Sequence, residues 1–134
     1  MRSLIIVLAL LLGSAAAHAQ TSPKKYLSAA TNNSTLVLSR SSVVKMIHAV
    51  NTTATLYYLK LYNKATAPVC GTDVPVFVSP LPAAVSGGPP VSPDISDGIL
   101  FPLGIGFCIT AGIADNDNTA AATGVAVNLG VTGR

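Results

Sequence analysis

Residues 55–63 read TLYYLKLYN, and this stretch decides the fold class. Successive side chains of an extended strand point to opposite sides. The two sides of this stretch are Tyr57, Leu59 and Leu61, and then Tyr58, Lys60 and Tyr62. The alternation of apolar and mixed positions, with several aromatic residues, is typical of a β-strand. We predict a strand whose Leu59 and Leu61 side chains face a hydrophobic core.

The same reasoning extends to the rest of the chain. Further short strands are predicted at 35–39, 42–50, 74–78, 98–103, 104–113 and 124–131. In the second of these, alternation places four residues on one face: Val44, Met46, His48 and Val50. The 11 Gly and 9 Pro divide the chain into short pieces, and Asp97-Gly98 is a turn signal. The sequence predicts an all-β, single-domain antiparallel β-sandwich of seven or eight strands, either jelly-roll or immunoglobulin-like.

The N-terminus has the parts of a secretory signal peptide. Arg2 is followed by an unbroken apolar run at residues 4–12, and Ala17-His18-Ala19 has the form of a cleavage site. The run is shorter than the roughly 20 residues that a spanning helix needs, although an uncleaved anchor is the alternative. We predict a signal peptide at 1–19, a flexible arm at 20–34 and the sandwich domain at 35–134. The mature protein is then exported, periplasmic or extracellular, without a membrane span.

Two cysteines, Cys70 and Cys108, are the only ones in the chain. In an exported protein they meet an oxidising compartment, which favours a disulfide between them. Two buried free thiols are the alternative. Outside the signal peptide the chain has one histidine, His48, which is too few ligands for a zinc site. No cofactor is predicted.

Charge argues against nucleic acid as a partner. The formal net charge is +3, and Arg2 contributes one of these charges. Between residues 20 and 130 the basic side chains all precede residue 65 and the acidic ones all follow it. If the two halves interleave in the sheets, opposite charges meet across strands, and if each half forms its own face, the molecule has a basic and an acidic side. Solvated charges on edges and loops are the other interpretation. A net charge this small does not indicate a phosphate-binding surface.

Several short patches resemble small β-sandwich proteins of bacteriophage and prophage genomes. They are residues 57–68 (YYLKLYNKATAP), 71–73, 75–76, 97–99, 104–106, 109–110, 114–117 and 127–129. The resemblance covers about residues 50–129 and implies a β-sandwich associated with a virion or tail. The chain departs from that group in its predicted signal peptide and its two cysteines. These differences indicate that a sandwich of this type functions here outside the cell.

The sequence carries no catalytic signature. The G-x-S-x-G motif of serine hydrolases is absent, and His48 lies in an apolar strand pattern typical of a packed or edge histidine. Asp94 and Asp97 are the nearest carboxylate pair, but their setting SPDISDG is typical of turns. We predict that the protein is not an enzyme.

Two patterns are candidate binding sites. Asp115, Asp117 and Thr119 present oxygens at the spacing of a calcium loop, although Ala120 and Ala126 replace the Gly and Glu of an EF-hand. A hydrogen-bonded turn is the alternative. Tyr58, Lys60 and Tyr62 share one strand face, where exposed rings would stack on a sugar and buried rings would belong to the core.

The predicted function is that of an exported, non-catalytic module with a structural or adhesive role. Its partner would be a glycan or a protein surface, and a homo-oligomer is one form it could take. The alternatives are a secreted, lectin-like carbohydrate-binding domain and a small secreted hydrolase.

Overall fold

A computed structural model describes residues 21–84 and 89–133. The predicted signal peptide at 1–19 lies outside the described residues. The described part of the chain forms eight strands: β1 (Ser22–Leu27), β2 (Thr35–Leu38), β3 (Ser42–Asn51), β4 (Tyr57–Asn63), β5 (Phe77–Leu81), β6 (Ile99–Phe101), β7 (Ile105–Thr110) and β8 (Val125–Gly133). No helix long and apolar enough to cross a membrane occurs within these ranges.

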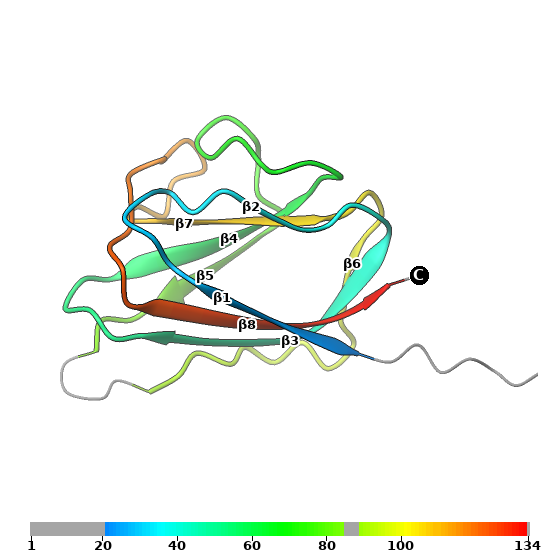
Figure 1. Ribbon diagram of the computed structural model, residues 1–134, viewed down its shortest axis with the longest axis horizontal. Coiled ribbons are helices and arrows are strands. Elements are labelled where there is room, and N and C mark those ends of the chain that lie inside the picture. The colour runs from blue at the N-terminus through cyan, green and yellow to red at the C-terminus, as the bar shows by residue number, and fades with distance from the viewer. Residues whose placement is uncertain (1–20, 85–88, 134) are drawn as a thin grey trace, which may run out of the picture.

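The strands form two four-stranded antiparallel sheets packed as a sandwich, as Figure 1 shows. One sheet has the order β1-β8-β3-β6, and the other has the order β2-β7-β4-β5. The core lies between them and consists mainly of alternate residues from the long strands. Leu59 and Leu61 are fully buried in that core, which confirms their predicted inward orientation. The all-β sandwich predicted from the sequence is therefore confirmed.

The N-terminal segment differs from its prediction. Residues 20–34 were expected to be a flexible arm, but Ser22–Leu27 forms β1 and pairs with β8 over six residues. The Tyr26 ring also packs edge-on against Phe107, with ring centroids 5.0 Å apart. Pro23, Lys24 and Lys25 made this stretch look like a loop, whereas such residues are also common on edge strands, where they prevent further pairing. The prediction of a flexible arm is therefore wrong for residues 22–27.

A β-bulge changes the faces of β3. Its pairing with β8 shifts between Val44 and Met46, which leaves Lys45 as the extra residue. Val44 is consequently buried in the core, while Met46 is exposed on the opposite side. The predicted common face of these two residues is wrong, because a bulge reverses the alternation that the sequence pattern assumes.

The strand predicted at 74–78 begins later, at Phe77, and continues to Leu81. Val76 still donates a backbone hydrogen bond to Leu61, so the chain approaches β4 before the strand begins. β5 is an edge strand of its sheet, which accommodates Pro80 because an edge residue does not need to donate on its free side.

Candidate functional site

The outer faces of the two sheets differ, and we name them by this difference. The outer face of the β2-β7-β4-β5 sheet is the covered face. Two loops lie over it in Figure 1: residues 64–76, the bridged loop, and residues 111–119, the aspartate loop. The outer face of the β1-β8-β3-β6 sheet is the open face, where side chains such as Leu27 and Met46 are exposed.

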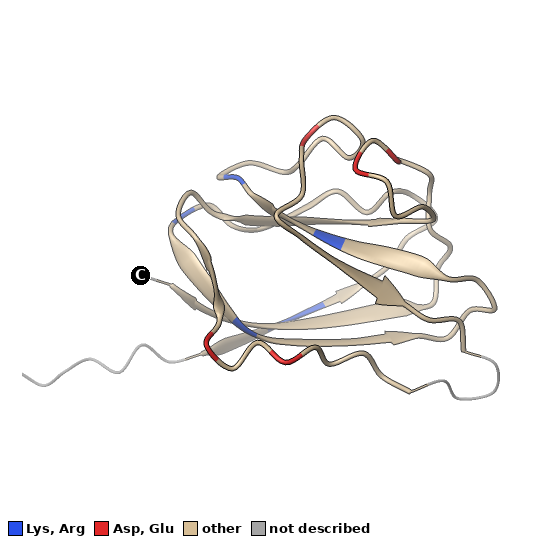
Figure 2. Ribbon diagram, turned by 180° about the vertical axis from the view of Figure 1, so that it is seen from behind, with Lys and Arg blue, Asp and Glu red and all other residues tan. Residues whose placement is uncertain are grey.

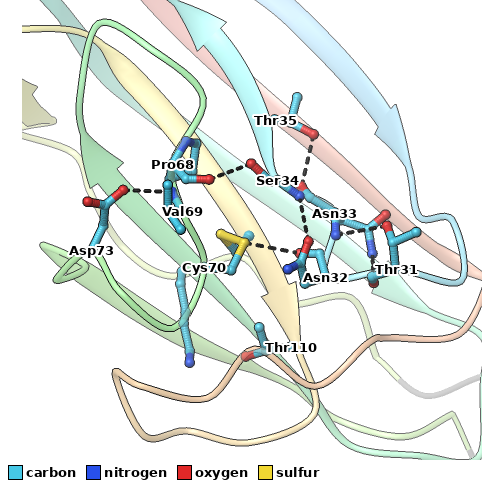
Figure 3. Close-up of a disulfide and its surroundings, with 12 residues drawn as sticks. Thr31, Asn32, Asn33, Ser34, Thr35, Pro68, Val69, Cys70, Asp73 and Thr110 are labelled. Carbon is cyan, nitrogen blue, oxygen red and sulfur yellow. Dashed lines mark hydrogen bonds between the residues drawn. A yellow bond between two sulfur atoms is a disulfide. The ribbon is translucent and has the colours of Figure 1, made fainter.

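A disulfide ties the bridged loop to the covered face. Cys70 in the loop and Cys108 on β7 are bonded, with their Cα atoms 6.1 Å apart, which confirms the predicted pairing. Figure 3 shows residues 31–35 alongside this loop, where the Ser34 hydroxyl donates a hydrogen bond to the Pro68 carbonyl. Sγ of Cys70 also lies 3.7 Å from the carbonyl oxygen of Asn32. The loop is thus held from β7 and from the segment that leads into β2.

The two loops lie in contact with each other, and the bridged loop is also held by an ion pair of its own. A Cβ atom on Gly71 would lie 2.9 Å from the carbonyl oxygen of Asn116, so the loops meet where only glycine fits. Within the bridged loop, the Lys64 ammonium lies 2.6 Å from Oδ2 of Asp73. The Val69 amide donates to the same oxygen over 2.6 Å. These two interactions lower the pKa of Asp73, the contact with Lys64 having the larger effect.

Lys60 is fully buried beneath the aspartate loop. It lies on β4 beside Cys108 of β7, and its ammonium donates hydrogen bonds to the carbonyl oxygens of Ala114 and Asp117. Burial lowers its pKa, and the nearby carboxylates of Asp117 and Asp115 oppose this effect. The Ala114 carbonyl also accepts from the Asp117 amide. Lys60 therefore satisfies its buried ammonium with loop carbonyls and joins β4 to the aspartate loop.

Tyr62 is also fully buried, next to the disulfide. Its hydroxyl has no hydrogen-bond partner among the described residues. Burial, followed by the charges of Asp73 and Asp115, raises its pKa to about 12. Since only Tyr58 of the predicted trio is partly exposed, Tyr58, Lys60 and Tyr62 do not form an exposed platform for a sugar.

The candidate calcium loop contains a hydrogen-bonded turn. Oδ1 of Asp117 accepts from the Thr119 hydroxyl at 2.6 Å, and its Oδ2 accepts from the Gly112 amide at 2.7 Å. Partial burial raises the pKa of Asp117, but these hydrogen bonds outweigh it and the net shift is downward. No cluster of three or more metal-ligating side chains occurs in the described part of the chain. The Asp117 and Thr119 side chains therefore hydrogen-bond within the loop, as in the turn alternative.

The open face carries a groove of about 550 Å³. Residues 92–97 form the edge segment, which Figure 1 shows running beside β3. One wall of the groove is the outer face of β3, and the other is residues 92–96 of the edge segment. Val91 and Ala49 exchange two backbone hydrogen bonds at the start of this segment. At its end the chain turns at Gly98, where φ is +78° and a Cβ atom would lie 2.5 Å from the Val43 side chain. The edge segment is thus fixed at both ends.

Polar groups converge in the groove beside apolar ones. Nδ1 of His48 lies 3.0 Å from the Ser92 hydroxyl, which joins β3 to the edge segment. The Asn128 side chain on β8 donates to the His48 carbonyl over 3.4 Å. At the other end, the Lys45 ammonium donates to the Asp97 carbonyl over 2.9 Å. Pro23 and Met46 contribute apolar surface between these contacts.

Sequence reasoning did not identify this groove. In the sequence His48 stands as a lone histidine, because its partners are distant along the chain and lie in segments without a motif. The register of β3 against β8 places Asn128 opposite His48. The Ala49–Val91 bridge brings Ser92 to the same end of the strand. A prediction of strand pairing would have found this cluster, whereas residue types alone do not.

The chain matches no family model, and no curated protein or solved structure is significantly similar to it. The resemblance to phage β-sandwich proteins therefore stays a prediction. The function has to be argued from the geometry.

Proposed function

We propose that the protein is an exported, non-catalytic binding module whose ligand site is the groove on the open face. The observation that carries the proposal is the convergence of His48, Ser92 and Asn128 beside apolar surface in one concave site. Concave sites that combine apolar walls with a few oriented polar groups are typical of ligand binding. The disulfide supports the exported location, since such bonds persist in oxidising compartments.

Binding is tested with the protein lacking residues 1–19, on arrays of glycans and of peptides. Met46→Arg places a long charged side chain in the groove, and we expect it to abolish binding of whichever probe the arrays identify. Leu100→Arg is the matched control, because Leu100 is similarly exposed on β6 and does not line the groove. Equal binding by Met46→Arg and the parent protein would contradict the groove as the site.

Export is tested separately, by expression of the full chain. We expect the protein outside the cytoplasm, beginning at Gln20. An intact mass that retains Met1 on soluble cytoplasmic protein would contradict the export proposal.

A second candidate function is serine-dependent hydrolysis in the same groove. The 3.0 Å contact between His48 and Ser92 favours it, because a histidine at this distance can accept the proton of a serine that attacks an ester. No carboxylate in the described ranges hydrogen-bonds to His48, so the third group of a triad is missing and this candidate ranks second. Labelling of the parent protein, but not of Ser92→Ala, by a fluorophosphonate probe would establish it.

A further inference from the structure

The strand register arranges the side chains of the open face in rows that run across the strands. His48 and Asn128 are cross-strand partners, and Ser92 extends their row through its contact with the His48 ring. Lys25 lies in the same row on β1, opposite Asn128. The two flanking rows are apolar and consist of Pro23, Gly130 and Met46 on one side and of Leu27, Ala126 and Val50 on the other. A polar row therefore crosses an otherwise apolar part of the open face.

Two side-chain atoms of the polar row are free to bind a ligand. The Asn128 amide donates from Nδ2 to the His48 carbonyl, and its Oδ1 has no partner among the described residues. The His48 ring contacts Ser92 through Nδ1, and its Nε2 has no partner within the same ranges. Directly opposed residues of antiparallel strands have Cβ atoms about 5 Å apart. Both side chains also line the groove, so the two free atoms are available to one ligand.

Hydroxyl groups match both free atoms. Oδ1 of Asn128 only accepts a hydrogen bond, whereas Nε2 of a neutral His48 donates or accepts according to the role that Nδ1 takes toward Ser92. A hydroxyl both donates and accepts, so it pairs with Oδ1 and with Nε2 in either state. A carboxylate only accepts and leaves Oδ1 unpaired. Two hydroxyls on adjacent carbon atoms, a vicinal diol, therefore fit the pair.

The charges around the groove do not favour a charged ligand. Lys45 and Asp94 both line it, and the Lys45 ammonium donates to the carbonyl of Asp97. With Lys25 of the polar row, two positive side chains stand near two negative ones. Such a balance gives neither an anion nor a cation an advantage. The ligand that suits this groove is neutral.

We propose that the groove binds a neutral glycan through a vicinal diol. One hydroxyl of the diol pairs with Nε2 of His48, and its neighbour donates to Oδ1 of Asn128. The apolar C–H face of the sugar ring packs against Met46 and Pro23, which line the groove beside the polar row. This inference rests on the proposed function, because it names the ligand class of the same site.

The diol is tested on the glycan array, half of which is treated with periodate. Periodate cleaves the carbon–carbon bond between the two hydroxyl-bearing atoms of a vicinal diol. We expect the protein lacking residues 1–19 to bind neutral glycans on the untreated half and to lose this binding on the treated half. Binding that survives periodate would overturn the inference. A preference for sulfated glycans or for glycans rich in uronic acids would overturn it as well.

The assignment to Asn128 is tested with Asn128→Leu. The variant removes Oδ1 at similar side-chain size and should weaken binding of the best glycan about tenfold, the effect of one lost hydrogen bond. Asn116→Leu is the matched control, because Asn116 is exposed on the aspartate loop and does not line the groove. Its binding should equal that of the parent protein.

Deoxy forms of the best glycan separate a direct contact from an effect on the fold. Each lacks one hydroxyl of the diol and should bind the parent protein about tenfold more weakly than the intact glycan. The form without the hydroxyl that faces Asn128 should bind Asn128→Leu and the parent protein equally. If Asn128→Leu weakens the binding of both deoxy forms further, the side chain acts through the fold and the inference fails.

Failure of this inference is distinguishable from failure of the proposed function. If Met46→Arg abolishes binding of a peptide while no glycan binds, the groove remains the ligand site and only the diol inference fails. If Met46→Arg weakens the binding of no ligand on either array, the proposed function itself fails.

Discussion

The covered face and the open face belong to sheets with the same number of strands, yet loops bury the first and leave side chains of the second exposed. On the covered face, Lys60 and Tyr62 are fully buried beneath two loops that Figures 1 and 2 show side by side. On the open face, Met46 and Leu100 remain 43% and 50% exposed. Loops bring backbone polar groups with them, so a sheet face covered by loops must satisfy those groups internally.

The covered face meets this requirement with specific residues. Lys60 donates to two loop carbonyls, Asp117 accepts from the turn of its own loop, and the disulfide holds the second loop in place. On the open face, the side-chain hydrogen bonds of the described residues are fewer and join β3 to the edge segment, through His48 with Ser92 and Lys45 with Asp97. The comparison shows that loops bury the outer side chains of one sheet, whereas Met46 and Leu100 on the other sheet stay exposed, and the proposed ligand groove lies on that exposed side.

The largest expected effect is in the core that both sheets share. Leu59→Ala removes a fully buried side chain and should lower the free energy of unfolding by about 2–5 kcal/mol, because it leaves a cavity. Leu100→Ala on the open face should change it by less than about 0.5 kcal/mol. Urea unfolding of both variants measures the difference. An equal loss of unfolding free energy in the two variants would mean that the Leu100 side chain is packed as tightly as that of Leu59.

The disulfide should have the next largest effect, and a local one. The Cys70→Ala/Cys108→Ala variant should lose about 2–4 kcal/mol of unfolding free energy, since the bond closes a loop between residues 38 positions apart. Release of the bridged loop should also expose Lys60 to an amine-reactive reagent, which mass spectrometry detects at that residue. Equally slow labelling of Lys60 in both proteins would show that the aspartate loop alone covers it.

Much of this architecture follows from residue patterns, because a two-residue period and turn residues are local signals. The inward side of β4 and the Cys70–Cys108 bond were both predictable in this way. The burial of Lys60 was not, since it depends on loops that the alternation does not place. The groove was not predictable either, because it arises from the bulge at Lys45 and from the Ala49–Val91 bridge, which depend on pairing between distant segments.

High pH should loosen the covered face through Tyr62. Its pKa is raised from 10.0 to about 12, so the folded state favours the neutral phenol. The stability contributed by Tyr62 is complete below pH 10 and is lost as the pH rises toward 12. The lowered pKa of Lys60 acts in the opposite sense, because its stability cost disappears as the pH approaches 10.5 from below.

Tyr62→Phe separates these two effects. At pH 7 it should change the free energy of unfolding by less than about 1 kcal/mol, because the hydroxyl that it removes has no partner among the described residues. Between pH 10 and pH 12 it should remove the part of the stability loss that Tyr62 causes. Urea unfolding at pH 9 and pH 11 measures both proteins, and parallel losses in the two would contradict the assignment to Tyr62.

The smallest expected effect on stability is that of Met46→Arg on the open face. An exposed side chain can be exchanged for a longer one that extends into water, so the free energy of unfolding should change by less than about 0.5 kcal/mol. The matched change on the covered face is Thr110→Arg, because Thr110 is fully buried beneath the aspartate loop and its hydroxyl donates to the Gly112 carbonyl. Thr110→Arg should cost at least about 2 kcal/mol, through the clash and the burial of an unpaired charge. Equal costs at the two positions would contradict the division into a covered and an open face, since the same residue would then meet the same environment on both sheets.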